Sequence, residues 1–96
     1  MGCKIIFAPE ALGDLAAAVR YIARDDPQTA KRVGDSLIDR VAILENFPLI
    51  GSKYPKSRGV MRLVSPPFII FYTADVNNGC VSILRYWHSA RGEPQF

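Results

Sequence analysis

The chain has 96 residues, of which 49% are hydrophobic and 22% are charged. This length and composition predict a single globular domain over residues 1–96 and argue against a disordered chain. No apolar run approaches the ~20 residues of a membrane span, and the first residues lack the apolar stretch of a signal peptide, so a cytoplasmic protein without a membrane partner is expected. Two cysteines and one histidine without metal-ligand spacing argue against a zinc site, and no metal or cofactor is expected.

Positive charge is concentrated in the second half of the chain. The formal net charge is +3, but residues 1–50 hold six Lys/Arg against seven Asp/Glu, whereas residues 51–96 hold six against two. No acidic residue lies between Asn46 and Ala74. Such a one-sided basic region favours an acidic partner, either a nucleic acid or an acidic protein segment. The alternative is a solvated surface with a chance imbalance of charge.

A short strand and an amphipathic helix are predicted at the start of the chain. Residues 3–8 (CKIIFA) are typical of a strand. Pro9 suits the first turn of a helix, and Glu10 and Asp14 follow near the positive end of its dipole. Apolar residues then recur with helical spacing and predict a helix over residues 9–25. Its predicted apolar stripe consists of Leu12, Leu15, Ala16, Val19, Ile22 and Ala23.

A second helix is predicted to follow almost without a connection. Asp26 is a favourable N-cap and Pro27 a favourable first helical residue, and the helix is predicted to end near Phe47, just before Pro48. The short connection predicts an antiparallel helical hairpin. Gly34 inside this helix costs about 1 kcal/mol relative to alanine, so we expect it to pack closely against the first helix.

Three strands are predicted in the second half, after an irregular loop over residues 48–57. They cover residues 60–64, 68–73 and 81–88. Pro66-Pro67 separates the first two, and Asn77-Asn78-Gly79 predicts a hairpin turn before the last. Strict alternation in the last strand predicts two sets of residues on opposite faces of the sheet. One set is Val81, Ile83, Arg85 and Trp87, and the other is Ser82, Leu84, Tyr86 and His88.

The order of these elements predicts an α+β fold of the type β-α-α-β-β-β. To bury both apolar stripes, the helical hairpin must pack on one face of a mostly antiparallel four-stranded sheet. The other face of the sheet is left to solvent or to a partner.

Cations on and beside the predicted sheet are the residues most able to carry chemistry. Arg62 lies in the second strand and Arg85 in the fourth, and either could hold a phosphate through a bidentate fork. Cleavage of RNA by its own 2′-hydroxyl needs such cations together with a base and a proton donor. His88 could be the acid or the base, and Tyr86 is a weaker candidate for the acid. The alternative is that both arginines form surface salt bridges and His88 caps the end of the sheet.

Aromatic residues in the same half could stack on bases, although at strand spacing they are more often part of a core or an interface. They are Tyr54, Tyr72, Tyr86 and Trp87. Standard enzyme signatures, namely a Gly-rich phosphate loop, HExxH and GxSxG, do not occur in the sequence.

Four segments, in order along nearly the whole chain, carry a family resemblance. They are residues 7–15 (FAPEALGDL), residues 21–23 (YIA) with 26–30 (DPQTA), residues 47–51 (FPLIG) leading to Arg62-Leu63, and residues 69–72 (IIFY) with 83–85 (ILR) and 88–91 (HSAR). In these segments the chain resembles the RelE/ParE superfamily of toxins from bacterial type II toxin–antitoxin systems, and the ParE branch most closely. The resemblance implies a small cytosolic toxin with the element order above. It also implies neutralisation by a cognate antitoxin, whose disordered and often acidic segment folds onto the toxin.

The superfamily divides by target, since RelE-type toxins cut messenger RNA on the ribosome and ParE-type toxins poison DNA gyrase. By motif position, Arg62 and Arg85 match the arginines that RelE-type toxins use on the scissile phosphate. His88 lies near the place of their catalytic acid, but HSAR endings are also common in the ParE branch. Lys53 and Lys56 do not clearly reproduce the RelE-type lysine pair. The resemblance therefore favours a gyrase poison without chemistry of its own.

Two alternatives stay open. The first is a RelE-like ribosome-dependent mRNA endoribonuclease with Arg62, Arg85 and His88 as catalytic residues, in which case the protein is an enzyme. The second is a non-toxic relic that only binds the antitoxin. In each case the basic half is expected to bind the target or the antitoxin. The residues predicted to do so are Lys53, Lys56, Arg58, Arg62, Arg85, Trp87, His88 and Arg91.

Overall fold

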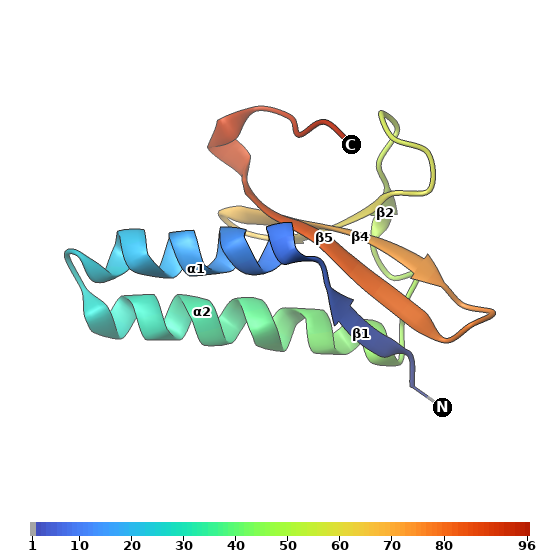
Figure 1. Ribbon diagram of the computed structural model, residues 1–96, viewed down its shortest axis with the longest axis horizontal. Helices are drawn as coiled ribbons and strands as arrows, with labels where there is room; N and C mark the ends of the chain where they lie inside the picture. The colour runs from blue at the N-terminus through green and yellow to red at the C-terminus, as the bar shows by residue number, and fades with distance from the viewer. Residues whose placement is uncertain (1) are drawn as a thin grey trace.

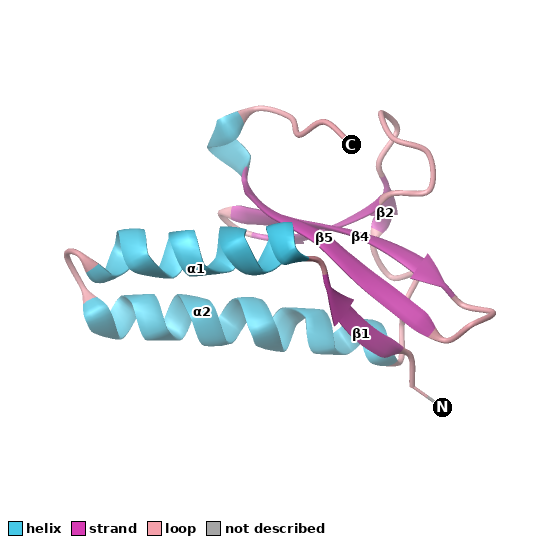
Figure 2. Ribbon diagram, viewed as in Figure 1, coloured by secondary structure: helices cyan, strands magenta, loops and turns pink. Residues whose placement is uncertain are grey.

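A helical hairpin and a mixed sheet form two layers in the computed structural model, which describes residues 2–96 (Figure 1). In chain order the elements are β1 (Lys4–Phe7), α1 (Pro9–Ala23), α2 (Pro27–Ala42), the 3₁₀ turn η1 (Ile43–Glu45), β2 (Ser52–Lys53), β3 (Met61–Ser65), β4 (Phe68–Asp75), β5 (Cys80–His88) and the 3₁₀ turn η2 (Ser89–Arg91) (Figure 2). Within these described residues, neither α-helix is long and apolar enough to span a membrane. The α+β class and the predicted order of the main elements are confirmed.

The sheet has five strands among the described residues, in the order β1-β5-β4-β3-β2. β1 pairs with β5 in parallel, and every other pair is antiparallel. The predicted number of four strands is too small because β2 lies within residues 48–57, which were expected to form an irregular loop. β2 contains only two residues, which pair with Met61 and Arg62, and two residues are too few to show an alternating pattern.

Both helices begin where local sequence signals predict. Pro9 and Pro27 occupy the first turns of α1 and α2, and the Asp26 carboxylate accepts a hydrogen bond of 3.1 Å from the Thr29 backbone amide. A second hydrogen bond, from the Thr29 hydroxyl, is the main reason that the pKa of Asp26 lies below its usual value. The predicted close contact at Gly34 is confirmed, since a Cβ there would lie 3.1 Å from a Val19 methyl carbon.

The main core fills the space between the helices and one face of the sheet. Its buried members come from α1, α2, η1 and three strands: Ala11, Leu37, Val41, Leu44, Leu63, Phe68, Ile70, Tyr72, Val81, Ile83 and Tyr86. The buried side of α1 is centred on Ala11, with Leu15 and Ala18 beside it, whereas Leu12 is 51% exposed. The predicted stripe on α1 is therefore wrong at Leu12 and Ala16, which are exposed, because the buried side runs through Ala11, Leu15 and Ala18 instead.

A β-bulge in β5 changes which of its side chains face the helices, compared with the prediction from strict alternation. Phe71 pairs with Arg85 and Tyr72 pairs with Ile83, so Leu84 is an extra residue opposite the Phe71–Tyr72 step. An extra residue reverses the alternation beyond it. Ile83 therefore faces the helices while Arg85 faces away from them, and the prediction that the two share a face is wrong.

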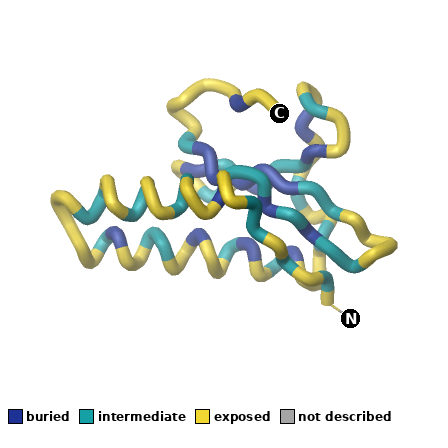
Figure 3. Tube along the Cα trace, in the orientation of Figure 1, coloured by how far each residue is buried: buried dark blue, intermediate teal, exposed yellow. Residues whose placement is uncertain are grey.

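The face of the sheet turned away from the helices carries a second, smaller cluster of buried residues. Its members are Tyr54, Val60, Phe71 and Trp87. The loop between β2 and β3 and the tail after η2 lie on this side of the sheet (Figure 1). The buried positions of both segments are visible in Figure 3. This outer face, expected to be open to solvent or a partner, is therefore partly covered by the chain itself.

Candidate functional site

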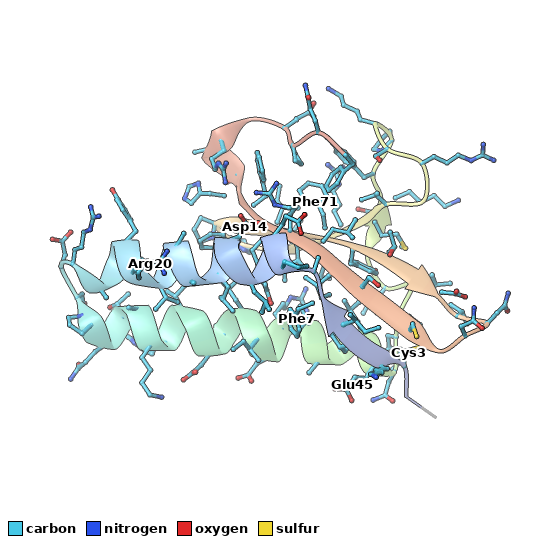
Figure 4. All side chains as sticks on the ribbon, viewed as in Figure 1. Cys3, Phe7, Asp14, Arg20, Glu45 and Phe71 are labelled. Atoms are coloured by element: carbon cyan, nitrogen blue, oxygen red, sulfur yellow. The ribbon has the colours of Figure 1, made fainter. Side chains whose placement is uncertain are left out.

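Two of the predicted cations flank an aromatic ring on the outer face. Arg62 on β3 pairs with Phe71 on β4, and Phe71 pairs with Arg85 on β5, so the three side chains form a row across neighbouring strands. Two strand spacings separate the arginine backbones by about 10 Å. The structure thus brings Arg62 and Arg85 to one surface, on either side of Phe71, which is labelled in Figure 4.

The guanidinium of Arg85 is held by Asp14 of α1. Arg85 Nε and Nη2 donate to Asp14 Oδ2 and Oδ1 at 2.7 and 2.9 Å, and the Tyr86 backbone amide donates to Oδ2 at 3.1 Å. The two side chains are only 26% and 12% exposed, respectively. The hydrogen bond to Asp14 is the largest cause that raises the pKa of Arg85 above its ordinary value. Asp14 thus occupies the Nε–Nη2 edge of the guanidinium, one of the two edges that can bind a phosphate through two hydrogen bonds.

Trp87 lies between two arginines on the outer face. The guanidinium carbon of Arg85 is 4.9 Å from the Trp87 ring centre, and that of Arg91 is 4.0 Å from it. These distances are typical of cation–π contacts. The indole Nε1 donates to the Gly92 carbonyl at 3.0 Å. Trp87 is therefore packed on several sides and is 8% exposed.

His88 lies on the opposite face of the sheet from Arg62 and Arg85. It pairs with Phe68, a member of the helix-side core, and the two rings meet edge to face at 5.4 Å. Its Nδ1 accepts a hydrogen bond of 3.1 Å from the Ala90 amide, which caps η2 and leaves the ring proton on Nε2. The imidazole lines a hollow of about 500 Å³ beside α1.

Tyr86, the weaker candidate for a catalytic acid, lies inside the main core. Its hydroxyl donates to the Leu37 carbonyl at 2.9 Å, and the side chain is 1% exposed. Burial raises the pKa of Tyr86 to about 12. A phenol with this environment is not positioned to meet a substrate from solvent. Tyr72 is similarly buried, and its hydroxyl accepts from the Gly51 amide at 3.0 Å.

The predicted cations of the β2–β3 region are exposed. Lys53 and Arg58 extend into solvent from β2 and the following loop, and Lys56 pairs with Glu93 of the tail. The hydrogen bond that Lys56 donates to the Glu93 carboxylate is the main cause that raises the pKa of Lys56. Arg62 lies 5.9 Å from the centre of the Tyr54 ring. The basic outer face therefore consists of Lys53, Lys56, Arg58, Arg62, Arg85 and Arg91.

Three residues that shape this face were not predicted. Asp14 was expected only to favour the helix dipole, and Glu93 and Phe96 lie in a tail without periodicity. The sequence does contain a signal that Asp14 lies close to the sheet. Asp14 is three residues after Ala11 and four before Ala18, at the margin of the buried side of α1. The tail offers no such signal, since its contacts depend on residues about 40 positions earlier.

The sequence profile described as the ParE toxin of the type II toxin–antitoxin system parDE matches residues 5–92. The chain belongs to the ParE toxin family. A similar fold appears in solved structures, and three of them are each 20% identical to this chain. One is a chromosomal ParDE system from P. aeruginosa, with a TM-score of 0.78 over 90% of this chain and 95% of that one.

The other two extend the likeness beyond ParE proteins. The toxin–antitoxin complex RelBE2 from Mycobacterium tuberculosis matches with a TM-score of 0.62 over 92% of this chain and 99% of that chain. The YoeB dimer from Staphylococcus aureus matches with a TM-score of 0.52 over 92% and 98%. None of the curated proteins matches this ParE-family sequence significantly. The predicted relationship to RelE/ParE toxins is thereby confirmed, and the shared fold does not separate the two types of target.

Proposed function

We propose that this toxin arrests growth by binding and poisoning DNA gyrase, without cleaving RNA. One observation carries the proposal, namely the separation of the three residues that a ribonuclease would combine. Arg85 is bound to Asp14 through two nitrogens, and His88 lies on the helix-side face, away from Arg62. A phosphate bound on the outer face would meet an Arg85 whose charge and Nε–Nη2 edge are already engaged by Asp14, and it would not meet the imidazole of His88.

The basic outer face suits a binding role. Lys53 and Arg58 have no acidic partner within residues 2–96, and neither does Arg62. Unpaired surface cations speed the encounter with an acidic protein and select it against basic ones. We therefore propose that this face contacts gyrase or the cognate antitoxin, and that the protein acts in the cytoplasm, where gyrase is found.

A supercoiling assay tests the gyrase proposal. Purified toxin is added to gyrase, ATP and relaxed plasmid, and the plasmid topology is read on a gel. We expect the toxin to inhibit supercoiling and the cognate antitoxin to relieve the inhibition. Gyrase that remains fully active at micromolar toxin would refute the proposal.

A ribosome-dependent endoribonuclease is the second candidate, because Arg62 and Arg85 do share one face in register across Phe71. Primer extension on a translated messenger RNA measures whether the toxin cleaves that RNA. Under the gyrase proposal no new 5′ ends appear. Cleavage by the wild-type toxin that is lost in Arg85→Ala would instead support the ribonuclease.

A further inference from the structure

Residues 92–96 cross the outer face of the sheet as a short tail. The Phe96 ring packs against Phe71 with ring centres 5.3 Å apart and against Tyr54 at 6.0 Å. Pro94 is buried, and the Glu93 carboxylate pairs with Lys56. The tail therefore brings one acid and, three residues later, one aromatic ring to the basic, aromatic surface between Arg62 and Arg85.

Few polar contacts hold the tail in place. Within residues 2–96, the hydrogen bonds that reach it are those from Trp87 to the Gly92 carbonyl and from Lys56 to Glu93, and no sheet ladder includes it. Phe96 remains 51% exposed although it touches two rings. Hollows of about 250 and 520 Å³ flank it, one lined by Arg85 and the other by Tyr54. One surface salt bridge, one hydrogen bond and two ring contacts are weak enough to be displaced by a competitor.

The charges around the tail identify the chemistry of that competitor. The tail supplies one carboxylate, whereas Lys53, Arg58 and Arg62 lack an acidic partner in the described part of the chain. A segment with several acids could pair with all of them and also fill the ring site with an aromatic residue. Rings that already lie edge to face around Phe96 would receive such a residue without rearrangement.

We propose that the outer face is a peptide-binding groove which the tail occupies in the free toxin, and that an acidic protein segment with an aromatic residue three positions after a Glu or Asp displaces the tail. The tail then lowers the affinity for every such partner, because the bound state must first release it. The proposal rests on the contacts of residues 92–96 and does not depend on gyrase as the target.

Fluorescence anisotropy with a fluorescein-labelled synthetic peptide, DDEPEF, tests the groove directly. Phe96→Ala removes the ring that occupies the site, and we expect it to bind the peptide about fivefold more tightly than the wild type. Phe47→Ala removes a phenylalanine that is 60% exposed after η1, and this matched control should bind like the wild type. A peptide with alanine in place of phenylalanine should bind weakly to all three proteins.

Two further measurements make each outcome decisive. Glu93→Gln removes the other tail contact and should also tighten binding, so the test does not depend on Phe96→Ala alone. The emission of Trp87, the single tryptophan, should change when peptide binds to the wild type, because the tail touches its indole. Equal affinities of wild type, Phe96→Ala and Glu93→Gln would overturn the proposal. So would a gain in affinity for a single-stranded RNA oligonucleotide instead of the peptide.

Discussion

The Asp14 carboxylate on α1 holds the Arg85 guanidinium on β5 through two hydrogen bonds, 71 residues apart along the chain. The same carboxylate accepts the backbone amide of Tyr86, directly after the bulge. Asp14 thus fixes the helical hairpin to the strand at the point where the alternation of β5 reverses. It also pairs with the Arg85 guanidinium, which would otherwise be free to bind phosphate.

Replacement of Asp14 by asparagine should destabilise the fold. It leaves the partly buried Arg85 without its charged partner, and we expect the free energy of unfolding to fall by about 2 kcal/mol. Urea unfolding followed by Trp87 fluorescence measures this change. Asp35→Asn is the matched control, because Asp35 pairs with Lys31 on the exposed surface and should have little effect. Equal stabilities of the two variants would contradict the structural role of Asp14.

Two glycine replacements should change stability in opposite directions. A Cβ at Gly51 would lie 2.5 Å from the Arg62 carbonyl and 2.6 Å from the Tyr72 hydroxyl, so Gly51→Ala should cost about 1–3 kcal/mol. Gly13 lies inside α1, and apart from the nearby backbone of this helix a Cβ there would meet nothing within 4 Å. Gly13→Ala should therefore stabilise the fold by about 0.5–1 kcal/mol. Thermal unfolding by circular dichroism measures both. A stabilising Gly51→Ala would show that the backbone at Gly51 does not approach Tyr72 as described.

The toxin should lose stability in alkali because of Tyr86. Its pKa is about 12 in the folded state against 10.0 for the ordinary side chain, so the folded state binds more protons between these values. The contribution of Tyr86 to the free energy of unfolding is fully present below pH 10. This contribution, on the order of 2 kcal/mol, is lost as the pH rises to about 12.

Tyr86→Phe tests this assignment. It should cost about 1 kcal/mol at neutral pH, through the lost hydrogen bond to Leu37, and should flatten the decline in alkali. Part of the decline will persist, because burial also raises the pKa of Tyr72. Tyr21→Phe is the control, since Tyr21 is 72% exposed and its loss should leave the profile unchanged. Identical profiles for both variants would count against Tyr86.

Arg62 should contribute to the affinity for the antitoxin. Arg62→Gln removes an unpaired cation at the centre of the basic outer face, and we expect binding to weaken by about fivefold at low salt. The difference from the wild type should shrink as salt screens the charge. Isothermal titration with purified antitoxin measures both effects. Arg24→Gln, at the exposed end of α1, should bind normally, and an equal loss there would point to net charge rather than this face.

Local signals in the sequence predicted much of the fold. Pro9, Asp26 and Pro27 act within one helical turn, and the close approach of Val19 to Gly34 occurs between adjacent helices. The turn at Gly79 is confirmed as well, with a φ of 64° and an Asp75 carboxylate that accepts from the Asn78 amide. Such features depend on neighbours in the chain and can be read from a single sequence.

The candidate site was less predictable because its geometry depends on distant residues. No residue type marks the bulge at Leu84 in the sequence. The bulge nevertheless places Arg85 and Ile83 on opposite faces of the sheet. The Asp14–Arg85 pair and the packing of Phe96 join segments that no periodic pattern connects. The sequence therefore predicted which residues carry charge but could not predict which of them are already paired.

Titration of the purified toxin into a gyrase supercoiling reaction decides between gyrase and messenger RNA as the target. Wild-type toxin should inhibit supercoiling in a dose-dependent way, antitoxin should restore it, and translated messenger RNA in a parallel reaction should stay intact. Full gyrase activity at micromolar toxin, together with cleavage of that messenger RNA, would contradict the gyrase proposal.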